Sequence, residues 1–446
     1  MQLMATILLR NGEVGCGLGI YDGDILIEGG KIVKILDRGH RIKGDKEIDC
    51  KGKLILPGFI DAHVHFRGGK ESYKEDFETG SAAAVSGGVT TVLDMPNNKP
   101  PILSKKDLEA KRKLVKGKSY CNYGFFIGFD GRNFEEISLS KNIAGVKVYM
   151  CDSTGEMGVG AKSVEDLFKN QKKIIVVHAE DGNCVSKNEK SYLAESLEGR
   201  KINPSIHSKI HSSKCASMAV KAVCELAKKS GKKVHIAHLS TECELEIVNK
   251  YRKAKVDVTC EVSPHHLVLS ENDYEHLGNL IKINPPVRSN NDLFAMWKGI
   301  KFGDIDIIAT DHAPHALVEK ELDYVRASAG VPELETLLPI LLNVVNDEGL
   351  TVAEVVKLCC ENPAKIFGLK GKGQIEEGFD ADIVVVDMEK VKDVRGADLF
   401  TKCKWSPYEG MSFKGWPVMT FVGGQIVFKD GKIVGKKVGR EVEFGG

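Results

Sequence analysis

The sequence predicts an α/β fold: a (β/α)8 TIM barrel with a second, smaller β-sandwich domain formed by both chain ends. Eight short β-branched runs alternate with helix-compatible segments in the middle of the chain, as in a parallel barrel. Both ends instead alternate apolar and polar residues around glycine pairs, which is typical of β-hairpins. The 446 residues accommodate a barrel of about 250 residues and one further domain.

The β-rich ends predict the smaller domain. DILIEGGKIVKI surrounds Gly29-Gly30, and TFVGGQIVFKDGKIVG surrounds Gly423-Gly424 and Asp430-Gly431. A further strand-like run, ADIVVVD, covers residues 381–387. The simplest arrangement is one β domain built from both termini, with the middle of the chain inserted into it. We therefore expect a discontinuous β domain over 1–56 and 366–446, and a barrel over 57–365.

Eight strand-like runs predict the barrel. In chain order they are LILPGFIDAHVHF, GVTTVLDM, NYGFFIGF, AGVKVYM, KIIVVHAE, KVHIAHLS, VDVTCEVS and IDIIATDHA. The segments between them have helical spacing, and AVKAVCELAKKSGKK reaches a glycine, Gly231, that suits a helix C-cap.

Composition excludes several classes of protein. Lys+Arg 63 against Asp+Glu 62 gives a net charge of +1, which leaves no basic excess for nucleic acid or an anionic membrane surface. The 12 cysteines include no CxxC pair, so we expect reduced thiols and no cysteine zinc site. The N-terminus has no signal-peptide pattern, and the longest apolar run, 337–345, is too short to span a membrane. We expect a soluble, cytoplasmic protein.

Metal-capable residues follow several of the predicted strands. They are His63 and His65 after the first strand, His178 after the fifth, His238 after the sixth and Asp311 after the eighth. Residues two apart in a strand face the same way, and barrel enzymes gather their chemistry at the carboxyl ends of the strands. Each histidine alone fits an ordinary core or surface role, but the set favours a binuclear metal site. By position His265, His266, His312 and His315 also qualify.

Lys147 lies inside the apolar run AGVKVYM. A lysine that faced the barrel interior would lose its charge, and its neutral amine could react with CO₂ to give a carbamate that bridges two metal ions. The alternative is that Lys147 faces outward and extends its amine to solvent. Asp152, just past the strand, is a rival bridge.

Eight ordered motifs carry a resemblance to a known family. They are PGFIDAHVHFR, VLDMPNNKP, GVKVYM, VVHAED, IAHLST, INPPVR, ATDHAPH and ENPAKIFGLKGKGQIEEGFDADIVVVD, from about Leu54 to Asp387. Together they resemble the amidohydrolase superfamily and, within its cyclic amidohydrolase branch, the dihydroorotase family. The flanking ends match the β-sandwich domain of that family.

The resemblance implies two zinc ions per subunit. His63, His65 and Asp311 would hold one and His178 and His238 the other, with carboxylated Lys147 as the bridge. Family members without this lysine use an aspartate in a D-D-G segment, whereas this chain has CDSTGEM. We therefore favour Lys147 over Asp152. His265 and His266 match a family segment not known to bind metal.

The resemblance also implies how a substrate carboxylate is held. Arg67, two residues beyond His65, is placed to bind that carboxylate with two N–H groups. The alternative is that Arg67 forms a salt bridge at the surface. Asn97 and His315 match family positions that help to hold the carboxylate. Asn284 matches a ring contact, and the backbone at Ala329-Gly330 matches a segment that closes over the ring. For Asn97 and Asn284 the alternative is turn chemistry beside proline.

The sequence departs from the family pattern in two loops. RGGKES stands where many members have Arg-Asp-Pro-Gly, and Glu333 in VPELET stands where glycine is frequent. Both departures concern the loops around the site more than the metal ligands.

The implied activity is that of a zinc-dependent cyclic amide hydrolase. It is the reversible cyclisation of N-carbamoyl-L-aspartate to L-dihydroorotate with release of water, in de novo pyrimidine (UMP) synthesis. A hydroxide between two metal ions would be the nucleophile, with Asp311 as general base and then acid.

Alternatives are a hydantoinase (dihydropyrimidinase) or allantoinase, a mononuclear deaminase, and a non-catalytic scaffold homologue. The expected partner is a small-molecule substrate, with neither nucleic acid nor membrane. The resemblance leaves open the oligomeric state and association with other pyrimidine-pathway enzymes.

Overall fold

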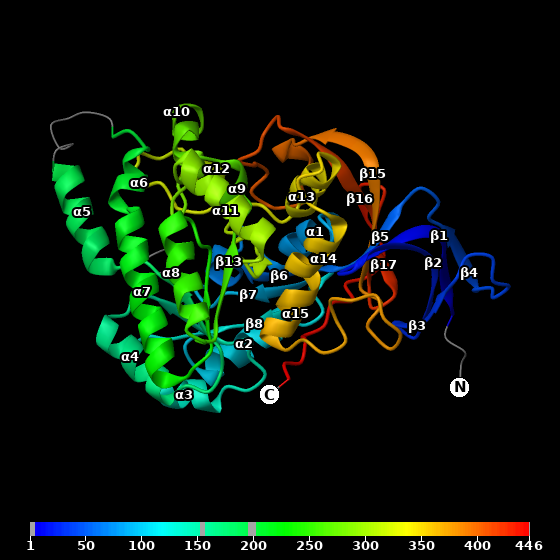
Figure 1. The fold of residues 1–446 in the computed structure, drawn as a ribbon, viewed down its shortest axis with the longest axis horizontal. Coiled ribbons are helices and arrows are strands. Elements are labelled where there is room, and N and C mark those ends of the chain that lie inside the picture. The colour runs from blue at the N-terminus through cyan, green and yellow to red at the C-terminus, as the bar shows by residue number, and fades with distance from the viewer. Residues whose placement is uncertain (1–4, 152–156, 195–201, 446) are drawn as a thin grey trace.

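The computed structural model describes residues 5–151, 157–194 and 202–445. Helices surround a set of parallel strands, and a large mixed sheet lies at one end of the molecule (Figure 1). The blue N-terminal strands and the orange and red C-terminal strands lie together in that sheet (Figure 1). Within the described ranges, no helix combines the length and the apolar character that a bilayer crossing requires.

Parallel strands form a closed barrel. They are β6 (Phe59–Val64), β7 (Val89–Asp94), β8 (Asn122–Phe125), β9 (Ile127–Gly128), β10 (Val146–Tyr149), β11 (Ile175–His178), β12 (Val234–Ile236), β13 (Val258–Val262) and β14 (Ile307–Ile308). Neighbours pair in chain order, and β8 and β9 are consecutive pieces of one strand position. A bridge from Val64 to His312 and a 2.8 Å hydrogen bond from His65 N to His312 O return the chain to β6. The predicted barrel is confirmed.

Helices follow the barrel strands and cover them. They are α1 (Phe77–Ser86), α2 (Lys105–Val115), α3 (Phe134–Leu139), α4 (Ala161–Asn170), α5 (Gly182–Ala194), α6 (Ile206–Ile210), α7 (Ser213–Ser230), α8 (Glu242–Lys253), α9 (His265–Val268), α10 (Tyr274–Leu277), α11 (Asn290–Phe302), α12 (Leu317–Lys320), α13 (Leu337–Asn346), α14 (Val352–Val356) and α15 (Asn362–Phe367). The α7 helix ends at Gly231 with φ 66°, as predicted, because glycine adopts the left-handed conformation of a C-cap without strain.

The second sheet joins both ends of the chain. Its strands are β1 (Ile7–Cys16), β2 (Gly19–Glu28), β3 (Lys31–Leu36), β4 (Lys46–Asp49), β5 (Leu54–Pro57), β15 (Ile383–Asp393), β16 (Ser412–Val422), β17 (Gln425–Lys429) and β18 (Lys432–Ile433). The predicted glycine pairs form its turns, with φ 59° and 83° at Gly29-Gly30 and 53° and 73° at Gly423-Gly424. A Cβ on Gly30 would lie 3.0 Å from Gly423 O, so these turns pack against each other and join the two termini.

The first predicted strand run divides between the two sheets. Leu54–Pro57 pairs with β1 and β15, whereas Phe59–Val64 is the first barrel strand. Gly58 lies at the junction, where a Cβ would lie 2.2 Å from the side chain of Thr90. Apolar residues buried in either sheet give the same sequence pattern, so the sequence did not show where this run divides.

The expectation of reduced cysteines is wrong for one pair. Cys184 in α5 and Cys215 in α7 form a disulfide across 31 residues of sequence. Helix packing brings their Cα atoms to 5.4 Å, a proximity that cysteine spacing could not reveal.

Candidate metal centre

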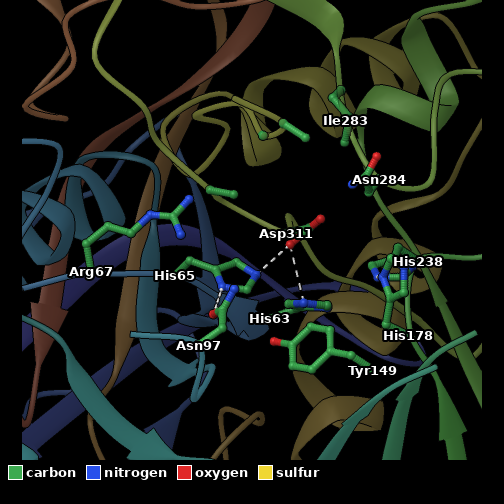
Figure 2. Close-up of a pocket in the computed structure, with 13 residues that line it drawn as sticks. His63, His65, Arg67, Asn97, Tyr149, His178, His238, Ile283, Asn284 and Asp311 are labelled. Carbon is green, nitrogen blue, oxygen red and sulfur yellow. Dashed lines mark hydrogen bonds and ion pairs between the residues drawn. The ribbon is translucent and has the colours of Figure 1, made fainter. Parts of the chain in front are cut away.

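The six predicted metal ligands converge at the carboxyl ends of the barrel strands. His63, Lys147 and His178 lie within β6, β10 and β11, while His65, His238 and Asp311 follow β6, β12 and β14. All six are buried. Around Asp311, Arg67 and His65 lie on one side of the cavity and His178, His238 and Asn284 on the other (Figure 2). The lining residues are His63, His65, Arg67, Asn97, Tyr149, His178, His238, Ile283, Asn284, Asp311, Ala313, Ala329 and Gly330.

His63 and His65 present their Nε2 atoms to Asp311. The Oδ1 atom of Asp311 lies 3.3 Å from His63 Nε2 and 2.8 Å from His65 Nε2. Burial favours a higher pKa for Asp311, but His63 and His65 outweigh it and hold that pKa below its usual range. For His65, burial lowers the pKa to about 4, so at neutral pH the ring is neutral and the carboxylate is ionised.

Hydrogen bonds on the far side of each ring fix which nitrogen is free. His63 Nδ1 lies 2.5 Å from Glu261 Oε1, and His65 Nδ1 lies 2.6 Å from Asn97 Oδ1. If each Nδ1–H donates to these oxygens, both Nε2 lone pairs face Asp311. Three acceptors that point at one another repel unless a cation lies among them. The site therefore fits a metal ion by the chemistry of its donors.

A second pair of ring nitrogens lies across the cavity. His178 Nδ1 and His238 Nε2 are 3.0 Å apart, and His178 Nε2 lies 2.9 Å from Glu180. Burial and the neighbouring His178 hold the pKa of His238 well below its usual value, so this ring is neutral and can act as a ligand. Ligand atoms of His63, His238 and Asp311 all lie within 4.8 Å of one another, so both groups of residues face a common volume.

Lys147 faces the barrel interior, which excludes the outward alternative. Its side chain is fully buried, and Nζ lies 3.4 Å from His63 Nε2. Burial lowers the pKa of Lys147 to about 8, although Glu261 and Asp311 oppose this shift. About a tenth of the amine is thus neutral at pH 7, and the neutral form is the one that carbamate formation requires. The rival bridge Asp152 lies outside the described residues.

Two buried carboxylates that the sequence analysis did not single out support the ligands. Asp61 accepts hydrogen bonds from the backbone N–H groups of His63 and Thr310, at 3.0 and 3.1 Å. Glu261 contacts His63, His235 and the backbone N–H of His238. The available signal was the one used for Lys147, because FIDAHV and VTCEV each place a charged residue inside an apolar strand.

Three residues of the site have a left-handed backbone conformation. Asp311, His238 and Arg67 have φ values of 51°, 38° and 49°, in the left-handed region that non-glycine residues rarely adopt. Such conformations persist where surrounding structure enforces them, often at functional sites. Here each turns the chain just after a strand end and directs a polar side chain into or beside the cavity.

Arg67 lines the cavity and is 2% exposed. Its Nε donates to Pro314 O at 3.3 Å, and Nη2 lies 3.1 Å from His315 Nε2. Its Nη1 has no hydrogen-bond partner among the described residues. Burial lowers the pKa of Arg67, yet a guanidinium stays protonated at neutral pH. A buried guanidinium whose Nη1 has no partner among the described residues is suited to an anionic ligand, and because the side chain is buried the surface salt-bridge alternative is wrong.

The other predicted substrate contacts are distributed around the cavity. Asn97, Asn284, Ala329 and Gly330 line the cavity. Asn284 Oδ1 lies 2.8 Å from Nε2 of His207, a residue that the sequence analysis missed. His315 lies behind Arg67 and not among the lining residues, with Nε2 3.0 Å from Ala329 O and Nδ1 3.1 Å from Lys74 Nζ.

The unusual Glu333 points into a buried network. Its carboxylate contacts His265 Nδ1 at 3.0 Å and the hydroxyl of Tyr408. His266 Nε2 lies 3.2 Å from Pro285 O. Neither His265 nor His266 lines the cavity. Glu333 is therefore accommodated away from the site. In RGGKES, the other loop that differs from the family pattern, Gly68 and Gly69 have φ 81° and 57°, so the turn depends on glycine.

Tyr149 was also missed. It lines the cavity two residues after Lys147, on the same face of β10, a position that strand alternation could have indicated. Its hydroxyl is buried and has no hydrogen-bond partner within the described chain.

Comparisons with known proteins agree with this geometry. The profile of the amidohydrolase family matches residues 54–427. The chain is 39% identical over 426 residues to a dihydroorotase of Pyrococcus horikoshii, covering 95% of this chain and 92% of that protein. It is 38% identical over 437 residues to a dihydroorotase of Methanothermobacter thermautotrophicus, covering 97% and 96%.

Solved structures of hydantoinases share the fold. The L-hydantoinase (dihydropyrimidinase) from Arthrobacter aurescens superposes with a TM-score of 0.94 at 28% identity, covering 99% of this chain and all of the other. A D-hydantoinase superposes with a TM-score of 0.91 at 26% identity and 98% coverage of both chains. The barrel, the accompanying β domain and the sequence relatives together lead to one conclusion: this chain belongs to the amidohydrolase family and, within it, to the dihydroorotases.

Proposed function

We propose that this protein catalyses the reversible cyclisation of N-carbamoyl-L-aspartate to L-dihydroorotate with release of water. The observation that carries the proposal is the buried Arg67 guanidinium, whose Nη1 lacks a partner among the described residues. Both molecules of the reaction bear a carboxylate, which a guanidinium binds with paired N–H groups. The named relatives support the same substrate class.

The charge around Arg67 supports an anionic rather than a neutral substrate. Lys74, a second buried amine 3.1 Å from His315, forms ion pairs with Glu71 and Glu319 at 3.4 and 3.0 Å. Arg67, in contrast, forms no ion pair with a carboxylate of the described residues, and burial of a charge without such a partner is unfavourable. A substrate carboxylate would relieve that cost, whereas a hydantoin or dihydrouracil, which has no carboxylate, would not.

Two divalent cations, with zinc as the candidate, fit the ligand set. His63, His65 and Asp311 would hold one, His178 and His238 the other, and carboxylated Lys147 would bridge them. Bound there, the ions would supply a nucleophile from water at neutral pH and polarise the amide carbonyl. The carboxylates behind the rings, Glu261 for His63 and Glu180 for His178, would fix the tautomer whose lone pair faces a bound metal ion.

The protein's own acid–base group is Asp311. In ring opening, its ionised carboxylate accepts a proton from the attacking water and returns it to the departing ring nitrogen. In cyclisation, it takes the proton of the attacking carbamoyl nitrogen and delivers it to the leaving hydroxyl, so that water is released. Arg67 and Asn284, on opposite sides of Asp311, would hold the substrate carboxylate and ring.

Hydantoin or dihydropyrimidine hydrolysis is the second candidate, because the superposed structures are hydantoinases. A shared fold cannot distinguish these substrates. Arg67 favours dihydroorotate, since a neutral ring would leave its guanidinium unpaired in the closed site.

A parallel assay with metal analysis tests the proposal. The purified protein is loaded with Zn²⁺, its metal content is measured, and kcat/KM is determined for carbamoyl-aspartate cyclisation and for opening of dihydroorotate, dihydrouracil, hydantoin and allantoin. We expect dihydroorotate and carbamoyl-aspartate to be preferred, with about two metal ions per chain. Faster opening of a neutral ring would reject the substrate assignment, and one ion per chain would reject the binuclear centre.

A further inference from the structure

Lys320 is a fully enclosed amine behind the substrate pocket. It is the last residue of α12, is 1% exposed, and donates from Nζ to Lys282 O at 3.0 Å, Ser328 O at 2.9 Å and Gly330 O at 2.9 Å. Lysine is rarely buried without a carboxylate. Burial lowers the pKa of Lys320, whereas three carbonyl acceptors, one for each N–H group of an ammonium, favour the protonated form.

The three carbonyls belong to two segments that line the pocket. Lys282 directly precedes Ile283 and Asn284, and Ser328 and Gly330 flank Ala329. A direct hydrogen bond from Gly330 N to Lys282 O at 2.9 Å joins the same segments. Lys320 therefore contacts both walls from the side away from the cavity.

The contacts with Lys320 also fix the direction of peptide N–H groups on the pocket side of the two segments. In a trans peptide the C=O and the next N–H point in opposite directions. Holding Ser328 O toward Lys320 directs the Ala329 N–H the other way, and holding Lys282 O does the same for the Ile283 N–H. The amine thus sets the orientation of peptide units at the cavity wall.

Further contacts fix Lys320 itself. Its Nζ lies 5.7 Å from the ring centroid of Trp405, and Trp405 Nε1 donates to His315 O at 2.8 Å. Ser328 N also donates to Glu319 O at 3.2 Å. The short helix α12 is therefore held between the loop that carries Ala329 and the segment that carries His315, next to Arg67.

We propose that Lys320 is a positioning residue that fastens the Asn284 and Ala329–Gly330 walls in the substrate-binding conformation. Its ammonium takes the place of a bound ion, with backbone carbonyls as ligands. The expected effect on substrate binding rests on the proposed function, whereas the role of Lys320 in holding the two wall segments together does not. Its loss would weaken substrate binding while leaving the metal ligands and Asp311 in place.

The test compares Lys320→Met with Lys372→Met in the holoenzyme. Lys372 is a matched control because it is also a largely buried lysine, but it binds Asp380 and Asp382 at 2.9 and 2.6 Å. We expect Lys320→Met to raise KM by on the order of ten- to a hundredfold with little change in kcat or metal content. Lys320→Gln, which retains two N–H donors, should recover part of the loss. Lys372→Met should lower stability without raising KM.

Hydrogen exchange gives a readout independent of substrate. Amides of residues 282–284 and 327–331 should exchange faster in Lys320→Met and not in Lys372→Met. Unchanged exchange and KM in Lys320→Met would overturn the proposal, as would equal effects in both variants. If the wild-type protein turns over none of these substrates but Lys320→Met still shows the local exchange, the proposed function fails and the fastening role stands.

Discussion

Replacement of Arg67 by methionine separates recognition of the carboxylate from the chemistry. Methionine fills much of the aliphatic volume but removes the charge and the unpartnered Nη1 group. Arg67 is 2% exposed, so a substrate carboxylate bound there would lose its counterion in a site closed to water. Truncation of one partner of such a buried pair costs about 2–5 kcal/mol. We expect about 4 kcal/mol, roughly a thousandfold in kcat/KM for dihydroorotate.

Two further quantities, the Ki of a neutral competitor and the thermal stability of the free protein, should not show this loss. The Ki of dihydrouracil, a competitor without a carboxylate, should change little. The free protein should keep its thermal stability or gain some, because the buried guanidinium of Arg67 forms no ion pair with a carboxylate in the part of the chain that the structure describes. Steady-state kinetics in both directions, inhibition by dihydrouracil and thermal unfolding measure these three effects.

Arg252→Met is the matched control. Arg252 contacts Asp306 and donates from Nε to Val258 O at 2.9 Å, remote from the lining residues. Its loss should reduce stability and leave substrate preference intact. The reasoning would be refuted if Arg67→Met lost affinity for dihydrouracil as much as for dihydroorotate, or if it retained near-normal kcat/KM for dihydroorotate.

Three further predictions concern the metal centre and the disulfide. Asp311→Asn should keep the fold by circular dichroism but lose about 10²-fold or more in kcat; near-normal turnover would remove Asp311 from acid–base chemistry. In metal-free protein, burial lowers the pKa of Lys147 from 10.5 to about 8, so between those pH values the unfolded chain binds more protons than the native one. Lys147 should therefore contribute about 3 kcal/mol to the rise in the free energy of unfolding across that window, and in Lys147→Met, followed by denaturant titration, the rise should be smaller by that amount. Cys184→Ser should lower the free energy of unfolding by about 3–4 kcal/mol, because the disulfide to Cys215 closes a 31-residue separation; a reductant should destabilise the wild type alone, and equal sensitivity of both would contradict this.

Sequence patterns predicted the ligand set because strand periodicity constrains where side chains point. His63 and His65 are two apart, so once β6 is a barrel strand both face the same side. The same periodicity left Lys147 undecided, since a four-residue strand can present either face inward. Contacts from β6 resolved it, with His63 Nε2 3.4 Å from the amine.

Other features depend on residues that are distant in the chain. Glu261 supports His63 across 198 residues, and Lys320 reaches Lys282 across 38. The Cys184–Cys215 disulfide forms only because α5 and α7 pack together. None of these partners follows a local spacing rule, so no motif could identify them.

The sequence by itself determined the alternation of strands and helices, the joining of both ends in one β sheet, and the residues able to bind metal. These follow from local rules: side-chain periodicity, glycine at left-handed turns and the scarcity of charge in apolar strands. Only the tertiary structure decided that Lys147 faces inward, that the Nη1 group of Arg67 at the cavity has no partner among the residues described, and that Lys320 contacts two pocket walls. Each of these depends on desolvation and on contacts across the barrel, which exist only when distant segments are brought together.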